Sequence, residues 1–372
     1  MNTRKISIGI EGVVPRGNGQ ETEQETGAGQ AAKSGRGEER EVVMITGASA
    51  GIGRATAQAF ARRGARIGLL ARGRQRLEAA RAEVESLGGE GLVLVADAAD
   101  DKGVEEAAGL LEERYGPIGI WVNNAMVSVF SPIIEMAPEE YRRVTEVTYL
   151  GYVWGTLAAL RRMRPRNRGV IIQVGSALAY RGIPLQSAYC ASKFAVRGFC
   201  DSLRAELIHD GKDIRVCIVE MPAVNTPQFG WVRSRLPKKA QPVPPIYQPE
   251  VAAEAIVFAA THNRREIYVG FPTVKAVVGN KVAPGWLDHL LGKTGYRSQQ
   301  TDEPEEAGRP DNLFAPPAGD RGAHGRFDQK AREFSLQLWL DEHLEFWHWF
   351  SRPAGSRPAG EKKGRVGTGG LK

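Results

Sequence analysis

Runs of apolar residues recur through the middle of the chain and alternate with helix-like stretches such as residues 54–64 and 74–88. The runs that read as buried strands are VVMIT (42–46), ARIGLLA (65–71), GLVLVAD (91–97), IGIWVNN (118–124), GVIIQVGS (169–176) and IRVCIVEMP (214–222). Strands that are apolar on both faces and alternate with helices indicate a parallel sheet covered on both sides. We therefore predict an α/β fold: a doubly wound, Rossmann-like parallel sheet with helices on both faces, followed by a C-terminal extension.

The pattern divides the chain into four parts. Residues 1–41 are predicted to be disordered, because their second half has no large apolar residue that could offset the entropy of ordering. The alternating pattern defines one domain over residues 42–270. An extension at 271–350 combines a proline-containing loop with a terminal helix, and residues 351–372 are predicted to form a disordered tail.

The terminal helix has the sequence FSLQLWLDEHLEFWHWF (334–350) and carries one strongly apolar face. So much aromatic surface must cover something. The possibilities are the protein's own domain, a second subunit or a membrane surface. Membrane binding is the least favoured, because the polar face is acidic rather than rich in lysine and arginine.

The charge balance of 50 basic and 43 acidic residues gives a net charge of +7, which raises the question of a nucleic-acid partner. Part of the excess is a run of five arginines between residues 161 and 168. No aromatic residues alternate with these arginines to stack bases, and no zinc-finger spacing occurs. We interpret the run as a solvated helix end and predict no nucleic-acid partner.

The remaining composition favours a soluble, cytoplasmic protein. Three cysteines without a CxxC pair fit a reducing compartment, and the N-terminus has no apolar segment of the signal-peptide kind. The longest uncharged stretch, residues 147–160, is too short to cross a bilayer as a helix. We expect it to form a buried or subunit-facing helix.

A glycine-rich turn, ITGASAGIGRA (45–55), follows the first strand and opens the first helix. Its glycines, Gly47, Gly51 and Gly53, do not have the GxGxxG spacing. They could nevertheless let the backbone approach a pyrophosphate, whose charge the amides of a helix N-terminus would then meet. The alternative is an ordinary tight turn between a strand and a helix.

The ends of the second and third strands bear on the choice of dinucleotide. An acidic residue at the end of the second strand would bind the ribose hydroxyl of NAD, whereas an arginine suits the phosphate of NADP. Here the strand ends at Arg72, with Arg74 just beyond and no carboxylate before Glu78. NADP is therefore favoured over NAD, unless Arg72 only starts a solvated helix. Asp97, after the third strand, could accept the adenine amino group or could cap a helix.

Tyr189 and Lys193 are four residues apart, so on a helix they share a face, and Ser176 lies thirteen residues before Tyr189 at the end of a strand. An ammonium beside a phenol favours the phenolate and is expected to lower the pKa of Tyr189. Such a phenol could exchange a proton with an alcohol or carbonyl oxygen that Ser176 holds, while a hydride moves at the adjacent carbon. We predict no metal site.

Together these motifs resemble the short-chain dehydrogenase/reductase family over about residues 42–270. TGASAGIG (46–53) matches its TGxxxGxG turn, NNAM (123–126) resembles its NNAG, and MPAVNTP (221–227) resembles its element that carries a nicotinamide-contacting threonine. The resemblance implies Ser176, Tyr189 and Lys193 as catalytic residues, and hydride exchange between a nicotinamide cofactor and an alcohol/carbonyl pair in a homodimer or homotetramer. The cofactor-binding residues then expected are Thr46, Gly47, Ser49, Gly51, Ile52, Gly53, Arg72, Asp97, Ala98, Asn123, Tyr189, Lys193 and Thr226.

Three positions depart from the family pattern. Met126 and Ala223 stand where the family has glycine, and Thr148 stands where it usually has an asparagine that supports a water-mediated proton relay from the lysine. Thr148 keeps a second hypothesis open, in which the protein is a catalytically weak dinucleotide-binding scaffold or sensor. Apolar residues at 227–249 suggest a substrate lid and a lipophilic carbonyl substrate; the alternative is a surface loop.

Overall fold

A computed structural model describes residues 40–343. Its centre is a parallel sheet of seven strands in the order β12-β7-β6-β4-β1-β2-β3, and the predicted fold class is confirmed. The strands are β1 (Val42–Thr46), β2 (Arg66–Ala71), β3 (Glu90–Val95), β4 (Ile120–Asn123), β6 (Gly169–Val174), β7 (Ile214–Glu220) and β12 (Glu266–Tyr268). The sequence pattern did not predict β12, because only three residues with a single buried apolar side chain form it.

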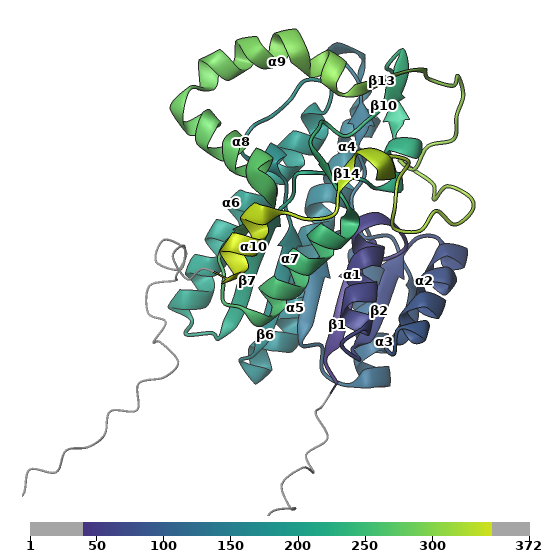
Figure 1. Ribbon diagram of the computed structural model, residues 1–372. Coiled ribbons are helices and arrows are strands. Elements are labelled where there is room, and N and C mark those ends of the chain that lie inside the picture. The colour runs from purple at the N-terminus through teal and green to yellow at the C-terminus, as the bar shows by residue number, and fades with distance from the viewer. Residues whose placement is uncertain (1–39, 344–372) are drawn as a thin grey trace, which may run out of the picture. The chain divides into compact units, whose positions relative to one another are not determined.

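Helices cover both faces of this sheet (Figure 1). The first face is covered by α1 (Gly51–Ala61), α2 (Arg74–Ser86) and α7 (Pro249–Thr261). The second is covered by α3 (Asp101–Tyr115), α5 (Gly151–Arg166) and α6 (Ser187–His209). A short helix α4 (Pro138–Thr145) and one π-helical turn at Glu146–Leu150 lead into α5.

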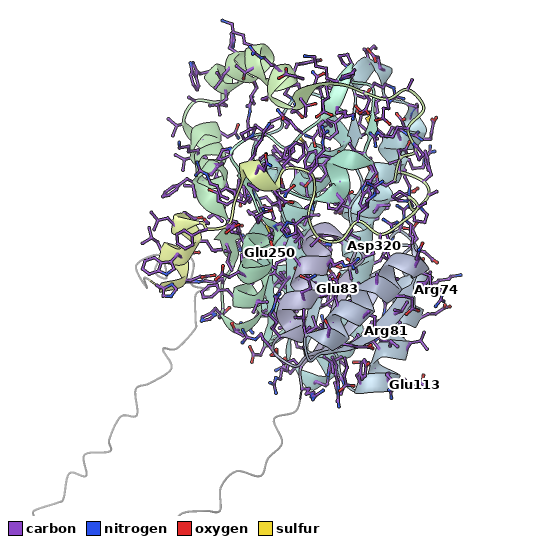
Figure 2. All side chains as sticks on the ribbon, turned by 45° about the vertical axis from the view of Figure 1, so that its right-hand side comes forward. Arg74, Arg81, Glu83, Glu113, Glu250 and Asp320 are labelled. Carbon is purple, nitrogen blue, oxygen red and sulfur yellow. The ribbon has the colours of Figure 1, made fainter. Side chains whose placement is uncertain are left out.

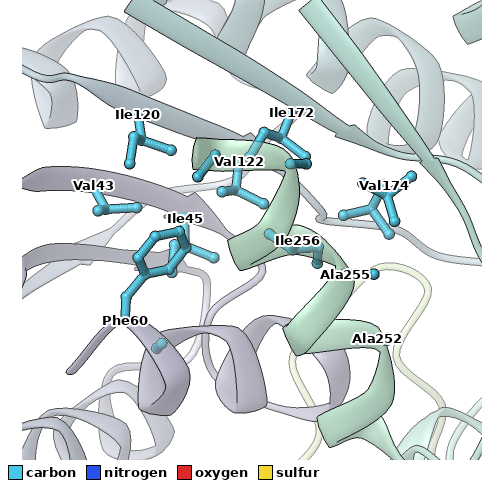
Figure 3. Packing of buried hydrophobic residues seen from close by; sticks show 14 of the residues in the cluster. Val43, Ile45, Phe60, Ile120, Val122, Ile172, Val174, Ala252, Ala255 and Ile256 are labelled. Atoms are coloured by element: carbon cyan, nitrogen blue, oxygen red, sulfur yellow. The ribbon is translucent and has the colours of Figure 1, made fainter. Parts of the chain in front are cut away.

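Successive residues of the central strands are buried on opposite faces, as a sheet covered on both sides requires. Val43 and Ile45 of β1 pack towards Phe60 of α1 and Ile256 of α7, as Figure 3 shows, whereas Met44 belongs to the cluster on the other face. None of these five side chains is exposed by more than about 1%. Removing this apolar surface from water is the main force that assembles the layers.

The strand order places a crevice at the carboxyl end of the sheet. The chain runs from β1 outward through β2 to β3 and then returns to β4 on the opposite side of β1. At such a reversal the loops after the two central strands diverge, and ligands bind in the space between them. The glycine turn after β1 and the NNAM segment after β4 are these two loops.

The chain beyond β12 packs back on the domain. Two helices, α8 (Gly270–Val282) and α9 (Pro284–Ser298), precede β13 (Gln300–Pro304), which pairs with β10 (Lys238–Ala240). A long loop at residues 305–327, here called the strap, then leads to β14 (Ala331–Arg332), which lies beside β11 (Ile246–Tyr247). Figure 1 shows the strap in yellow-green.

The last described helix, α10 (Leu336–His343), is the first half of the predicted terminal helix; its second half lies outside the described residues. Leu338 is 2% exposed and joins the core cluster of α1 and α7. Arg264 donates a hydrogen bond to the Asp341 carbonyl of α10 at 3.0 Å. This part of the helix therefore packs on its own domain. Nearly all of the N-terminal segment and all of the tail predicted to be disordered also lie outside the described residues.

The first four arginines of the run lie at the C-terminal end of α5 and pair with acidic side chains. Arg161 and Arg162 both bind Glu105, and Arg164 binds Asp210. Positive side chains at a helix C-terminus are also favoured by the helix dipole. Within residues 40–343, no helix combines the length and the apolar character that crossing a membrane would need.

Leu338→Ala tests whether α10 is part of the core. Removing a buried leucine side chain should lower the free energy of unfolding by about 2–4 kcal/mol, through lost burial and the cavity that remains. The matched control is Trp339→Ala, because this neighbouring side chain is 42% exposed and should cost much less. Thermal and urea unfolding of both variants measure the difference. Equal stability of the Leu338 variant and the wild type would contradict the packing of α10 on the domain.

Candidate functional site

A cavity of about 410 Å³ lies at the carboxyl end of the sheet. The glycine turn, the ends of the central strands, the segment after β7 and the strap line it. Most of the predicted site residues meet there, namely Gly47, Ser49, Gly51, Ile52, Arg72, Asp97, Ala98, Ser176, Tyr189, Lys193 and Thr226. Thr46, Gly53 and Asn123 do not line it.

The glycine turn has the shape of a backbone cradle. Gly47 and Gly51 have φ values of +69° and +57°, which residues with a side chain rarely adopt. A Cβ atom on Gly53 would lie 2.3 Å from the Gly47 carbonyl oxygen and 2.5 Å from Asn124 Nδ2. These glycines therefore bring α1 and the turn close together. The result is a surface of backbone beside the N-terminus of α1, which suits a phosphate group.

Thr46 and Asn124 hold the turn against the loop after β4. The Thr46 hydroxyl accepts hydrogen bonds from the backbone N–H groups of Asn124 and Ala125, at 3.0 and 3.1 Å. The Asn124 amide donates back to the carbonyls of Thr46 and Gly47. Thr46 thus positions the cradle from behind, and Asn124, which the sequence analysis did not single out, lines the cavity.

Asn123 lies on the other side of the strand from the cavity. Its side chain is fully buried, accepts a hydrogen bond from Trp121 Nε1 at 2.8 Å and donates to Thr156 and Gln173. Adjacent residues at a strand end point to opposite faces. Asn124 therefore lines the cavity, whereas Asn123 links β4 to α5 and β6.

The three arginines near the end of β2 point in different directions. Arg72 lines the cavity and donates to the backbone carbonyls of residues 312, 313 and 314 in the strap, at 2.6, 3.3 and 3.1 Å. Arg74 is exposed at the outer edge of α2, beside Glu78 (Figure 2). Arg76, one turn after Arg72, lines the cavity with its guanidinium 5.3 Å from the Trp231 ring centre. The sequence did not single out Arg76, because it lies inside a helix and belongs to no motif.

Asp97 lines the cavity, but its carboxylate already has partners. Asp97 Oδ1 accepts the Ala99 backbone N–H at 3.0 Å, and Oδ2 pairs with Arg143 of α4. Arg143 also donates to the Leu313 carbonyl of the strap at 3.0 Å. Asp97 therefore joins the end of β3 to α4 and, through Arg143, to the strap.

The strap forms part of the cavity wall. Asn312, Pro316 and Pro317 line the cavity, and the Leu313 side chain is buried in an apolar cluster with Val127. Further along, the Gly322 carbonyl accepts the Gly51 backbone N–H of the glycine turn at 3.2 Å. The extension thus reaches the glycine turn, a contact that its proline-rich sequence did not reveal.

Asp320 anchors the strap to α1 through Arg54. The guanidinium of Arg54 is buried and pairs both with Asp320 and with Glu83 of α2. Figure 2 labels the two carboxylates, Glu83 on α2 and Asp320 on the strap, which lie close together. A buried guanidinium needs such partners, because an unpaired charge in the interior is strongly unfavourable.

Ser176, Tyr189 and Lys193 come together as the spacing predicted, at the end of β6 and on one face of α6. Lys193 Nζ lies 5.6 Å from the centre of the Tyr189 ring. The Ser176 hydroxyl hydrogen-bonds to Tyr189 and also accepts the Leu178 backbone N–H at 3.1 Å. A hydroxyl, a phenol and an amine therefore meet in one corner of the cavity.

Burial dominates the ionisation of this group. It raises the pKa of Tyr189 above its usual range, while the hydrogen bond with Ser176 opposes the rise. Burial also lowers the pKa of Lys193 to about 7, and the charge of Glu220 opposes that fall. The expectation that the pKa of Tyr189 is lowered is therefore wrong, because burial outweighs the contact that favours the phenolate.

Thr148 and Tyr152 lie beneath this corner, on the helix that precedes the arginine run. The Thr148 hydroxyl donates to the Val127 carbonyl at 2.9 Å and accepts the Val127 backbone N–H at 3.1 Å. The Tyr152 hydroxyl accepts a hydrogen bond from Lys193 Nζ at 2.9 Å. Thr148 therefore fixes the loop after β4, and Tyr152 is the residue of this helix that contacts Lys193.

Glu220, at the end of β7, is a further buried group beside the site. Its Oε2 accepts the Ser176 backbone N–H at 2.6 Å, and its Oε1 has no hydrogen-bond partner among the described residues. Burial, with the nearby charge of Glu266, raises the pKa of Glu220 to about 8. A carboxyl group that ends an apolar strand was the one signal in the sequence that could have marked it.

Part of the cavity wall is apolar. Of the predicted lid residues, Phe229, Trp231 and Val243 line it, together with Met126 and Phe130. Leu236, Ile246 and Tyr247 do not line it and are buried in the surrounding structure. The segment thus contributes an apolar surface to the wall of the cavity.

Gly53→Ala tests the cradle. Because the new Cβ would meet the backbone of the turn, the turn must shift, and we expect a loss of about 1–3 kcal/mol in stability together with weaker dinucleotide binding. Gly198→Ala on the exposed side of α6 is the matched control, since its Cβ would meet nothing within 4 Å. Alanine there should stabilise the helix slightly. Melting curves and fluorescence titration with NADPH check both variants, and unchanged NADPH binding by the Gly53 variant would contradict the cradle.

Comparison with known proteins finds dehydrogenases and oxidoreductases. A family model described as short chain dehydrogenase matches residues 41–236. The uncharacterized oxidoreductase YxnA of Bacillus subtilis (strain 168) is 33% identical over 288 residues, which make up 76% of this chain and 81% of that protein. Estradiol 17-beta-dehydrogenase 11 of Mus musculus is 29% identical over 245 residues, or 66% of this chain and 80% of that protein.

The similar solved structures are also dehydrogenases. An alcohol dehydrogenase from the archaeon Thermococcus sibiricus, complexed with 5-hydroxy-NADP, has a TM-score of 0.54 at 29% identity and covers 62% of this chain and 96% of its own. A short-chain dehydrogenase from Streptomyces avermitilis has a TM-score of 0.59 at 25% identity and covers 71% of this chain and all of its own. With the sheet order, the glycine turn and the assembled serine, tyrosine and lysine, these matches show that the chain belongs to the short-chain dehydrogenase family.

Proposed function

We propose that this protein is an NADP(H)-dependent oxidoreductase that transfers a hydride between the nicotinamide and an alcohol/carbonyl pair. The observation that carries the proposal is the meeting of Ser176, Tyr189 and Lys193 in the cavity whose other end is the glycine cradle. A proton-transfer group and a phosphate-binding backbone in one cleft are what such a reaction requires.

Each residue then has a defined task. Ser176 holds the substrate oxygen by a hydrogen bond, and Tyr189 exchanges a proton with that oxygen. Lys193 provides positive charge when the Tyr189 phenolate forms. The bound nicotinamide supplies or accepts the hydride, and in its oxidised form it carries a positive charge. Thr226, which lines the cavity, would contact the nicotinamide end.

The preference for NADP rests on Arg72 and Arg76. Both guanidinium groups line the cavity near the end of β2, and no carboxylate lies at that strand end. Arg76 has no hydrogen-bonded acceptor among the described residues, so its donors are available to a phosphate. Two similar solved structures, the archaeal alcohol dehydrogenase and a metagenomic short-chain oxidoreductase, are described with 5-hydroxy-NADP and NADP.

The apolar wall favours a lipophilic substrate. Phe229 and Val243 would contact the part of the substrate beyond its oxygen, whereas Trp231 lies beside Arg76. The similar mouse protein is named for a steroid alcohol, estradiol, which is consistent with an apolar substrate. We further propose a homodimer or homotetramer in the cytoplasm, without a nucleic-acid partner.

A scaffold or sensor without turnover is less well supported. That hypothesis depended on Thr148, which replaces an expected asparagine. In the structure Thr148 binds Val127, while Lys193 has its own partners and stays beside Tyr189. The reacting groups are therefore assembled despite the replacement.

Tyr189→Phe should abolish nearly all turnover, because phenylalanine keeps the shape of the ring but cannot exchange a proton. The measurement is NADPH consumption with a panel of ketones and aldehydes, with NADPH binding as a check that the cleft is intact. Tyr149→Phe, which removes a hydroxyl outside the cavity, is the matched control and should keep its activity. A Tyr189 variant with a tenth or more of the wild-type rate would refute the assignment.

Arg76→Ala should weaken NADPH binding about ten- to a hundredfold and leave NADH binding nearly unchanged, because a charge-assisted hydrogen bond to phosphate is worth about 1.5–3 kcal/mol. Arg72→Ala should also weaken NADPH binding, but it should loosen the strap as well. Arg74→Ala is the control, since Arg74 faces solvent. Equal affinities of the wild type for the two dinucleotides in titration calorimetry would refute the proposed preference.

A further inference from the structure

Lys193 depends on two acceptors for its buried amino group. Its Nζ donates to the Val174 carbonyl at 2.7 Å and to the Tyr152 hydroxyl at 2.9 Å. The side chain is 2% exposed, and no carboxylate hydrogen-bonds to it among the described residues. Because a buried ammonium without acceptors is strongly unfavourable, these two contacts decide where Nζ lies and how readily it stays protonated.

The Tyr152 hydroxyl is arranged as an acceptor. It donates its own proton to the Val174 carbonyl at 3.0 Å, so its lone pairs face Lys193. Burial raises the pKa of Tyr152 well above its ordinary value, so the phenol stays neutral. Tyr152, Val174 and Lys193 thus form a closed triangle of hydrogen bonds. An ammonium has three N–H groups, so one remains for the side of the cavity.

No other side chain on this stretch of helix takes that place. The Thr148 hydroxyl, one turn earlier, both donates to and accepts from the Val127 backbone. Tyr149 is half-buried and does not line the cavity. Tyr152 is the residue of this helix whose polar atom reaches Lys193.

We propose that Tyr152 is a positioning residue for the reaction: its hydroxyl holds the Lys193 ammonium beside Tyr189 and thereby supports proton transfer. The inference rests on the proposed function, in which Tyr189 exchanges the proton. Tyr152 itself does not line the cavity and acts through Lys193.

The sign of the expected effect follows from the charges. Loss of the Tyr152 hydroxyl removes an acceptor from the charged form of Lys193, so the pKa of Lys193 falls further below its ordinary value. The pKa of Lys193 is about 7 and lies below that of Tyr189, so the first proton that the pair loses comes off with the pKa of Lys193. Reduction needs the pair before this loss and oxidation needs it after, so the apparent pKa in the pH profile of kcat moves downward for either direction of the reaction.

Other ionisable groups face this pair and stay in place. The charge of Glu220, at the end of β7, raises the pKa of Lys193, and Cys200 of α6 lies near Tyr152. Arg197 of α6 faces Glu220. Since a change at Tyr152 leaves all three unaltered, their contributions are common to the wild type and the variant.

The test uses Tyr152→Phe in the full chain, with Tyr149→Phe as the matched control. The pH profile of kcat is measured with NADPH and the carbonyl compound of the panel that the wild type reduces fastest. We expect Tyr152→Phe to lower kcat about 10- to 100-fold, the effect of one hydrogen bond to a charged group, and to lower the apparent pKa by about one unit. The control should match the wild type in both.

A second measurement does not depend on turnover. NMR titration of the Lys193 side chain, assigned with Lys193→Met, should give a lower pKa in Tyr152→Phe than in the wild type. Melting curves and NADPH binding verify that the variant folds. If it does not fold, 3-fluorotyrosine at position 152 keeps the shape and weakens the acceptor, and should shift both pKa values in the same directions by less.

The outcomes distinguish a failure of the proposed function from a failure of the role of Tyr152. If Tyr189→Phe keeps its activity, the proposed function fails. If Tyr189→Phe is inactive while Tyr152→Phe has the wild-type pH profile and the wild-type pKa of Lys193, the proposed function stands and the role of Tyr152 is refuted. A lower rate with an unshifted profile also refutes it, because a merely structural change would give that result.

Discussion

Keeping the amino group of Lys193 in the protein interior requires hydrogen-bond acceptors at fixed places, because a buried ammonium cannot be solvated by water. The structure provides a backbone carbonyl from the end of β6 and a phenol from α5. Neither carries a charge, so neither offsets the burial that lowers the pKa of Lys193 to about 7. A group in that state responds strongly to small changes in its surroundings, which suits a residue that must support a proton transfer.

The hydrogen bonds of this amine connect it to the sheet. The Val174 carbonyl accepts from both Lys193 and Tyr152 at the point where β6 gives way to Ser176. Glu220 accepts the Ser176 backbone N–H from the neighbouring strand, and a Cβ on Gly175 would lie 2.2 Å from its Oε2. A glycine and a buried carboxyl group therefore shape the end of β6 and allow the chain to turn away from the neighbouring strand. Ser176 is placed by these neighbours as much as by its own spacing from Tyr189.

What the sequence could predict was local. Apolar runs fix strands because both faces of a parallel sheet are buried, and the spacing of Tyr189 and Lys193 fixes a shared helix face. The sequence could not show that Asn124 rather than Asn123 lines the cavity, because a strand that ends one residue earlier or later reverses the facing of both. The contacts of Tyr152 and Glu220 join residues far apart in the chain, and no periodic pattern encodes such pairs.

The strap shows how a segment without regular structure becomes part of a site. Its backbone carbonyls, rather than any motif of side chains, bind Arg72, and a carbonyl is present in every residue, so the composition of the strap gave no sign of this role. These carbonyls engage three of the five N–H groups of the guanidinium and leave two. An arginine held this way loses little further side-chain entropy when it meets a phosphate. The extension, anchored through Asp320 and Arg54, thereby ties the stability of the C-terminal region to the geometry of the end of β2.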